Sequence, residues 1–363
     1  MRRPPPALIL AAALLAAAGP LAGCLPSSQK TNTRAMSAAD SASVALAQTV
    51  TPDTLALAWT ADLTGRAPYP TGLAWVRPDS ADARLAVVDT QDGRVLVYSA
   101  AGDSLAAVEL PDGPGRFPYL AGVRGDTVLV LSRGRGTVDG VVLGAAGPPA
   151  LARSLAVPDG ATAAAPTARG LVLRVGGGAT EAAPALVRLD ARGREAARYP
   201  LAGGWRASGF VRAWGDTLLA LSGYRPVADV LAPASAPGAT LDTLAFRGFD
   251  SPQLVRSHQF RLGEIDEPPL LTSSAAALGD TLYVLNLRAD HVRVDLYGRA
   301  GRLRGALVSP RPWAIQESYA TDLAVRRTAG GAVEIAVLMQ RPSGFLQRAA
   351  ARVDLFRWSS PAL

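Results

Sequence analysis

The sequence predicts an all-β fold in which six four-stranded antiparallel sheets form a ring, and two observations carry that prediction. An alternating, strongly apolar strand recurs with a period of roughly 45 residues from residue 70 to residue 358. A weaker strand precedes each copy and another follows it, with glycine-containing turns between them. Four strands in a unit of this length are typical of one blade of a β-propeller. Six such units predict a six-bladed propeller.

The clearest unit lies at residues 279–307, where residues 282–287 and 292–297 alternate and a turn at 298–301 leads into a third run. Three units share a Gly-Asp-Thr turn before the strong strand, at residues 125–127, 215–217 and 279–281. Glycine permits positive φ, and aspartate can accept hydrogen bonds from backbone amides. The blades are expected at residues 70–111, 117–157, 161–202, 206–263, 270–308 and 317–358.

The last unit has no fourth strand of its own, whereas an isolated strand-like segment at residues 54–62 precedes the first unit. We expect this N-terminal strand to pair with the last blade and close the ring, which removes an exposed sheet edge. The propeller domain is therefore predicted to span residues 54–363. Helical periodicity is absent from it, so no helix is expected there.

The N-terminal segment has the features of a targeting signal. Residues 1–23 combine two arginines, a short apolar run and small residues, as an export signal does. The run Leu-Ala-Gly-Cys at 21–24 resembles a bacterial lipobox, which implies a diacylglycerol-modified Cys24 and an extracytoplasmic protein anchored to a membrane. Leu25 would favour the outer membrane under the sorting rule of enteric bacteria. Residues 24–53 are predicted to be a flexible tether, and no later segment is apolar enough to span a bilayer.

Composition sets further limits. Hydrophobic residues make up 49% of the chain and charged residues 18%, which suffices for a large core and excludes general disorder. Only Lys30 among the 37 basic residues is a lysine. The arginines reflect either a GC-rich genome or a surface that binds anions, and both interpretations remain open. Because there is no Lys/Arg-rich block, nucleic acid is not an expected partner.

The first unit carries a family resemblance. Residues 70–75 (PTGLAW), 85–89 (LAVVD) and 93–98 (GRVLVY), followed by Gly102, resemble a blade of the NHL-repeat and TolB-like six-bladed propellers. The resemblance implies that ligands bind on the face formed by the loops between second and third strands and the connections between blades. There it gathers arginines, aromatic residues and histidines as binding-face candidates. These are Arg116, Arg133, Trp205, Arg206, Tyr224, Arg225, His258, Arg288, His291, Trp313 and Arg341.

These residue types suit a binding module. Arginine binds carboxylates, phosphates and acidic glycans, and aromatic faces bind sugars or peptide side chains. We expect a partner that is another envelope protein, or a peptide or glycan ligand, and we expect no cofactor or metal. The long fourth unit, at residues 241–269, is a candidate lid or partner contact. A further alternative is a subunit of a larger membrane complex.

The alternative is an enzyme. Six-bladed lactonases of the gluconolactonase type hold a divalent cation in the channel, and hydrolase candidates here are Asp322, Asn286 and His291. Asp322 is the acid expected on an axis-lining strand. The chain has two histidines, one cysteine and no Gly-x-Ser-x-Gly or His-Glu-x-x-His motif, so the sequence leans away from catalysis.

Overall fold

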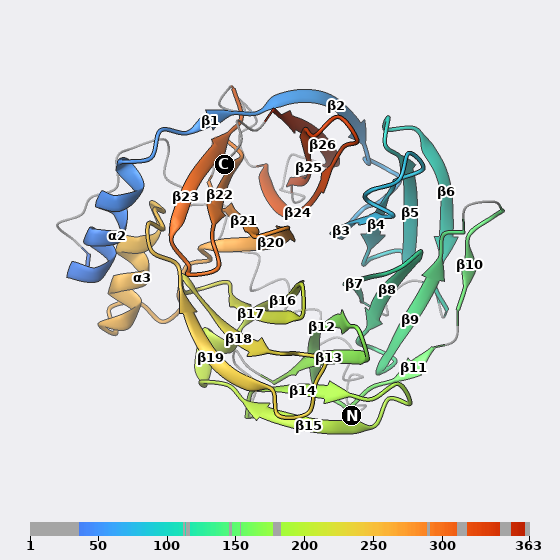
Figure 1. Ribbon diagram of the computed structural model, residues 1–363, viewed down its shortest axis with the longest axis horizontal. Coiled ribbons are helices and arrows are strands. Elements are labelled where there is room, and N and C mark those ends of the chain that lie inside the picture. The colour runs from blue at the N-terminus through green and yellow to red at the C-terminus, as the bar shows by residue number, and fades with distance from the viewer. Residues whose placement is uncertain are drawn as a thin grey trace, which may run out of the picture.

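The computed structural model describes residues 36–111, 113, 117–144, 147–152, 154–176, 183–288, 291–310, 318–341 and 350–359. The strands form six small sheets, which are arranged as blades around one axis (Figure 1). Each blade begins with the strand nearest the axis and proceeds outward. The all-β, six-bladed prediction is confirmed.

Blades 1 to 4 follow one another along the chain, and within each blade consecutive strands pair in antiparallel fashion. Blade 2 has a split outer edge, because β10 and β11 both pair with β9. The bounds are β3 (Pro70–Val76), β4 (Arg84–Asp89), β5 (Arg94–Ser99) and β6 (Ser104–Glu109); β7 (Pro118–Arg124), β8 (Thr127–Ser132), β9 (Thr137–Val142), β10 (Ala150–Leu151) and β11 (Leu155–Ala156); β12 (Ala161–Thr167), β13 (Gly170–Val175), β14 (Ala185–Leu189) and β15 (Glu195–Pro200); β16 (Gly209–Trp214), β17 (Thr217–Ser222), β18 (Val227–Ala232) and β19 (Thr240–Ala245).

Blades 5 and 6 each take one strand from the N-terminal part of the chain. Strand β2 pairs antiparallel with β26, so the predicted closure of the ring is confirmed, and β1 adds a parallel edge to β23. Figure 1 shows this N-terminal segment running along the outside of both blades. The bounds are β1 (Asp53–Thr54) and β2 (Ala56–Asp62); β20 (Thr272–Leu278), β21 (Thr281–Asn286), β22 (Arg293–Tyr297) and β23 (Leu303–Val308); β24 (Tyr319–Arg327), β25 (Val333–Arg341) and β26 (Ala350–Trp358).

The hydrophobic core is divided among the seams between neighbouring blades. Each seam holds its own cluster of buried side chains; Val87 and Val353, for example, meet between blades 1 and 6. Between blades 1 and 2 the cluster includes Val88 and Val130. Alternating strand residues face the two neighbouring seams in turn. Such packing holds each blade to its two neighbours, but it does not by itself connect blades across the axis.

Among the described residues, helix α3 (Leu254–Arg261) and the short 3-10 helix η3 (Gly204–Ala207) correct the expectation that residues 54–363 contain no helix. A further helix, α2 (Ala38–Gln48), precedes the propeller. Helix α3 occupies the long connection after blade 4, so that the sheet of this blade ends at Ala245. Helices α2 and α3 lie side by side outside the ring (Figure 1). In the described ranges no helix is long and apolar enough to cross a membrane.

Helix α2 also corrects the flexible tether predicted for residues 24–53. Ser37 caps the helix by accepting a hydrogen bond from the amide of Asp40 at 3.1 Å. Val44 and Ala47, three residues apart, are buried against the core between blades 4 and 5. Ser43 links the helix to the connection that leads to α3: its hydroxyl donates to the Phe249 carbonyl and accepts from the Gly248 amide. Residues 1–35, with Cys24, lie outside the described part.

We expect the substitution Val44→Asp to detach α2 while leaving the propeller folded, because Val44 is fully buried and a carboxylate there would lack a partner. If the substitution lowers the free energy that holds α2 on the propeller by about 1.4 kcal/mol, the detached helix is populated about tenfold more. Limited proteolysis of residues 36–50 then becomes about tenfold faster. Ala45→Asp, at an exposed position of the same helix, is the matched control. Equal cleavage rates in the two variants would show that the helix is not held by this contact.

Candidate functional site

A central cavity of about 520 Å³ opens at the start of the innermost strands. Its wall takes residues from all six innermost strands, so the whole ring builds it. It lies on the face that carries the loops between second and third strands, which is the face that the family resemblance implies for ligands. Side chains on its wall include Thr71, Tyr119, Arg133, Thr162, Ser208, Phe210, Arg212, Tyr224, Ser273, Thr321 and Asp322.

Asp322 is the buried carboxylate of this cavity and joins four blades. From β24 in blade 6, its Oδ2 accepts from the Leu73 amide of blade 1 at 2.6 Å. Its Oδ1 accepts from Arg212 Nη2 of blade 4 at 3.1 Å and from the Ser274 hydroxyl of blade 5. Arg212 also donates to the Ala275 carbonyl at 2.8 Å. The pair therefore acts as a latch across the axis.

The latch bears on the predicted hydrolase site. Asp322 already accepts three hydrogen bonds, and the guanidinium of Arg212 fills the place where a cation would pair with it. Asn286 is buried on β21, where its side-chain amide donates to Asp295 and to the Asp250 carbonyl. Neither Asn286 nor His291 lines the cavity with Asp322. The three candidates are not brought together.

Asp322 is the one carboxylate among the described residues of this wall. No group of three or more His, Cys, Asp or Glu side chains placed to hold a metal occurs in the part of the chain that the structure describes. A hard cation prefers six or more oxygen ligands without a neighbouring positive charge. The residues at Asp322 therefore do not fit a channel cation of the lactonase kind.

Arg133 brings a second guanidinium to the cavity. It follows β8 in blade 2, donates to the Thr162 carbonyl of blade 3, and stacks over the Tyr119 ring with its guanidinium carbon 3.9 Å from the ring centroid. The side chain is open to solvent inside the hollow, while the surrounding protein lowers the pKa of its guanidinium by burial. Arg133 thus presents an accessible positive charge on an aromatic support.

Aromatic side chains form the rest of the wall and part of its rim. Tyr224 lines the cavity and packs edge-on against Trp205, with 5.0 Å between ring centroids. Tyr69, at the start of blade 1, is 49% exposed, and Phe117, at the start of blade 2, is 39% exposed. Burial, and then the neighbouring Tyr119, raises the pKa of Tyr69. The rim therefore offers stacking surfaces beside the cavity.

The other binding-face candidates have different environments. Arg206 forms a bidentate pair with Asp229, at 3.1 and 2.7 Å, and Arg288 bonds Asp250, so both arginines serve the fold. The remaining described candidates do not line the cavity: Arg225, His258, His291 and Arg341. Arg116 and Trp313 fall outside the described residues.

The residues that sequence reasoning missed are Tyr119, Phe210, Arg212 and a set of hydroxyls. The hydroxyls are Thr71, Thr162, Ser208, Ser273 and Thr321. Thr71, Tyr119, Thr162, Phe210 and Ser273 each stand second in an innermost strand. Aligning these strands by their first residues would have revealed a polar or aromatic ring at one level of the channel.

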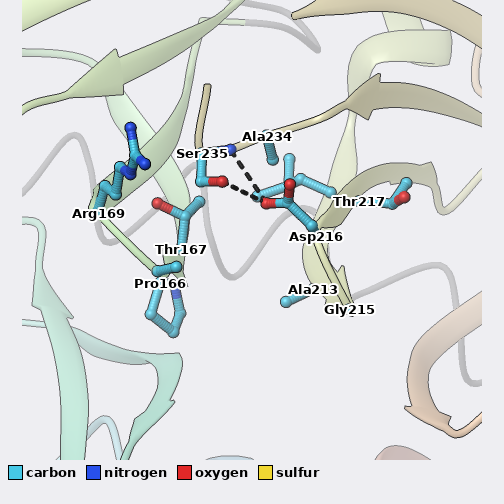
Figure 2. Close-up of a pocket in the computed structure, with 11 residues that line it drawn as sticks. Pro166, Thr167, Arg169, Ala213, Gly215, Asp216, Thr217, Ala234 and Ser235 are labelled. Carbon is cyan, nitrogen blue, oxygen red and sulfur yellow. Dashed lines mark hydrogen bonds between the residues drawn. The ribbon is translucent and has the colours of Figure 1, made fainter. Parts of the chain in front are cut away.

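A second hollow, of about 400 Å³, lies on the opposite face between blades 3 and 4. Figure 2 shows its wall, which includes Arg169 and Thr167 from the β12–β13 hairpin and Asp216 beside Ser235. Asp216 accepts hydrogen bonds from the amide and the hydroxyl of Ser235, at 3.3 and 2.5 Å. Its carboxylate therefore ties a hairpin to the β18–β19 connection, and the hollow is smaller than the central cavity.

No family model matches the sequence, and no curated protein sequence matches it. Similar solved structures include a virginiamycin B lyase from Staphylococcus aureus, with a TM-score of 0.47, 9% identity, and coverage of 84% of this chain and 89% of that chain. A regucalcin from Agrobacterium tumefaciens, described as calcium-binding, has a TM-score of 0.48 and 12% identity, and the match covers 84% of this chain and 97% of that chain. A glutaminyl cyclase from Myxococcus xanthus has a TM-score of 0.40 and 12% identity, with coverage of 85% of this chain and 100% of that chain. These distant likenesses assign no residue role, and the fold rests on the six sheets themselves.

We expect Asp322→Ala to lower the free energy of unfolding by about 3–5 kcal/mol, because it leaves Arg212 and the buried Leu73 amide without their acceptor. Adding Arg212→Met should restore part of the loss by removing the orphaned charge. Asp280→Ala is the control, since the Asp280 side chain is 81% exposed, and it should cost less than about 0.5 kcal/mol. Chemical denaturation measures all three. Equal losses for Asp322→Ala and Asp280→Ala would refute the latch.

Proposed function

We propose that this protein is a binding module that takes a small peptide or glycan ligand, free or as part of an envelope partner, in the central cavity. The observation that carries the proposal is the cavity itself: about 520 Å³, walled by all six innermost strands and lined by aromatic rings and hydroxyl groups. Ligand pockets of small molecules have volumes of roughly 300–1,000 Å³. Rings supply contact area, and hydroxyls on rigid strands fix orientation.

Binding is favoured over catalysis by the state of the charged groups. The cavity carboxylate is held by three donors, and its arginine neighbour makes further bonds to the Ala275 and Val211 carbonyls at 2.8 and 3.0 Å. A general base must be within reach of a proton and free to accept it. Asp322 is engaged in holding the blades together, which supports a rigid receptor.

We also propose that the protein works outside the cytoplasm on a bacterial membrane, held by a lipid on Cys24. The support is the export-type N-terminus and the lipobox-like run that ends at Cys24, the single cysteine of the chain. Helix α2, which begins 14 residues after Cys24, is packed on the propeller, so the free tether would be short. The propeller would then stay close to the membrane surface.

Loss of the aromatic wall should weaken ligand binding. Peptide and glycan arrays first identify a ligand that the wild-type protein retains. For that ligand, Tyr224→Ala should raise the Kd roughly tenfold, because a stacked aromatic side chain contributes on the order of 1–1.5 kcal/mol. Tyr199→Ala, on the outermost strand of blade 3, should leave the Kd within about twofold. Titration by fluorescence anisotropy gives both values. A ligand whose affinity is insensitive to Tyr224 but sensitive to other surfaces would place the site elsewhere.

Lipid attachment has a direct test. Cells that express the full chain should incorporate labelled palmitate into it, and the protein should sediment with membranes. Cys24→Ser should abolish both the label and the sedimentation, since no other thiol is available. A wild-type protein that takes up no label would refute the anchor without affecting the cavity.

A further inference from the structure

The charges around the central cavity do not cancel. Its lining holds three charged side chains, Arg133, Arg212 and Asp322. Arg212 and Asp322 neutralise one another at 3.1 Å, which leaves the charge of Arg133. Among the described residues, no carboxylate forms an ion pair with Arg133, and its polar contact is Nη2 with the Thr162 carbonyl. Its Nε and Nη1 groups remain available, and the lining carries a net single positive charge.

A second positive charge lies behind the same wall. Arg174, on β13 of blade 3, is 1% exposed, and its Nη2 donates to the carbonyls of Phe210 and Leu221 at 3.3 and 3.0 Å. Its Nε and Nη1 have no hydrogen-bond partner. Burial lowers the pKa of Arg174 to about 10, so the side chain remains charged near neutral pH. Phe210 lines the cavity, which places this guanidinium directly behind the lining.

The position of Arg174 is apolar in the other comparable blades. It is the penultimate residue of a six-residue second strand, and the equivalent residues of blades 1, 2, 4 and 5 are Val88, Leu131, Leu221 and Leu285. Each of these four packs in the seam toward the next blade. Among the described residues Arg174 forms no ion pair, and Asp229, whose charge partly restores the pKa of Arg174, is paired with Arg206. A buried charge without a direct partner costs stability that an apolar side chain would not. Packing alone therefore does not explain the arginine.

Both arginines act on one side of the cavity. Arg133 reaches the start of blade 3 through the Thr162 carbonyl, and Arg174 lies between blades 3 and 4 behind Phe210. A charge buried in protein is screened much less than one in water, so Arg174 raises the potential at this wall without touching a ligand. Ser208 adds a hydroxyl donor there, while the Thr162 hydroxyl donates to the Arg174 carbonyl at 3.3 Å. The opposite wall contributes the neutralised Asp322.

We propose that the wall formed by blades 2 to 4 is a subsite for a single carboxylate group of the ligand. Arg133 binds the carboxylate directly, Ser208 donates to it, and Arg174 strengthens its binding from behind the wall. The rings of Tyr119 and Tyr224 contact the neutral body of the ligand. One accessible guanidinium matches one negative charge. This inference rests on the proposed function, because it assigns a chemical class to the ligand of the same cavity.

The bare carboxylate tests the subsite. Acetate and its neutral isostere acetamide are titrated into the full chain at constant ionic strength, and apparent affinities follow from the rise in the unfolding midpoint. We expect acetate to stabilise the wild-type protein and acetamide to have no comparable effect. Arg133→Met should weaken acetate binding roughly tenfold or more, because it removes the charge and its hydrogen bonds. Arg133→Lys should weaken it less, because lysine keeps a positive point charge.

Arg174→Met separates a field effect from a structural role. It should raise the unfolding midpoint without acetate, because the buried charge is removed, and yet lower acetate affinity roughly two- to fivefold. A merely structural arginine would not show these opposite effects. Arg169→Met, at an exposed position on the opposite face (Figure 2), removes the same charge and should change neither quantity. If acetate and acetamide act alike, or if Arg169→Met weakens acetate binding as much as Arg133→Met does, the subsite is refuted.

Two matched pairs identify the carrier of the carboxylate and separate the two proposals. Glucuronate against glucose represents an acidic sugar, and N-acetylalanine against its amide represents a peptide C-terminus. The acid of one pair should bind more tightly than its neutral partner, in a manner that depends on Arg133. Neutral partners that bind as well as the acids would overturn the carboxylate subsite and leave the binding cavity intact. Absence of binding by all four compounds and by acetate would count against both.

Discussion

The structure depends on one carboxylate that four blades share. The apolar clusters hold each blade to its neighbours, whereas the Arg212–Asp322 pair connects blade 4 with blade 6 across the axis. Because Asp322 also accepts from Leu73 and Ser274, the innermost strands of blades 1 and 5 are fixed to the same point. This contact bounds the central cavity at one level. The same contact occupies the carboxylate of Asp322 with three hydrogen-bond donors.

The repeat could be read from the sequence because each blade must satisfy the same local rules. The Gly-Asp-Thr turns do adopt the backbone they predicted, with φ of 61° at Gly125, 64° at Gly215 and 58° at Gly279. Helix α2 could not be found in this way. Its Ser/Ala-rich sequence has little periodicity, and it is stabilised by contacts of Val44 and Ser43 with a connection about 200 residues away. Such long-range docking leaves no local pattern.

In the candidate site, too, some features follow from local sequence and others from contacts between distant residues. The family resemblance pointed to the face on which the central cavity opens, and two of the candidates it gathered there, Arg133 and Tyr224, line that cavity. The sequence could not distinguish Arg133 from Arg206, because the two differ in their partners. Asp229 neutralises Arg206, whereas Arg133 stacks on the ring of Tyr119. Arg174 was invisible for another reason. In a chain rich in arginine, a single charge within an apolar strand attracts notice only when the register of the blades is known.

The closure of the ring also sets the order in which the fold can be completed. Strand β2 pairs with β26, which lies about 300 residues later in the sequence, so β2 has no partner strand until β26 has been synthesised. Contacts of such long sequence separation form slowly, and an unpaired strand edge invites association with other chains while it waits. A truncated product that lacks β26 would leave β2 without its template. Pairing of β26 with β2 therefore completes the sixth sheet and closes the ring in one step.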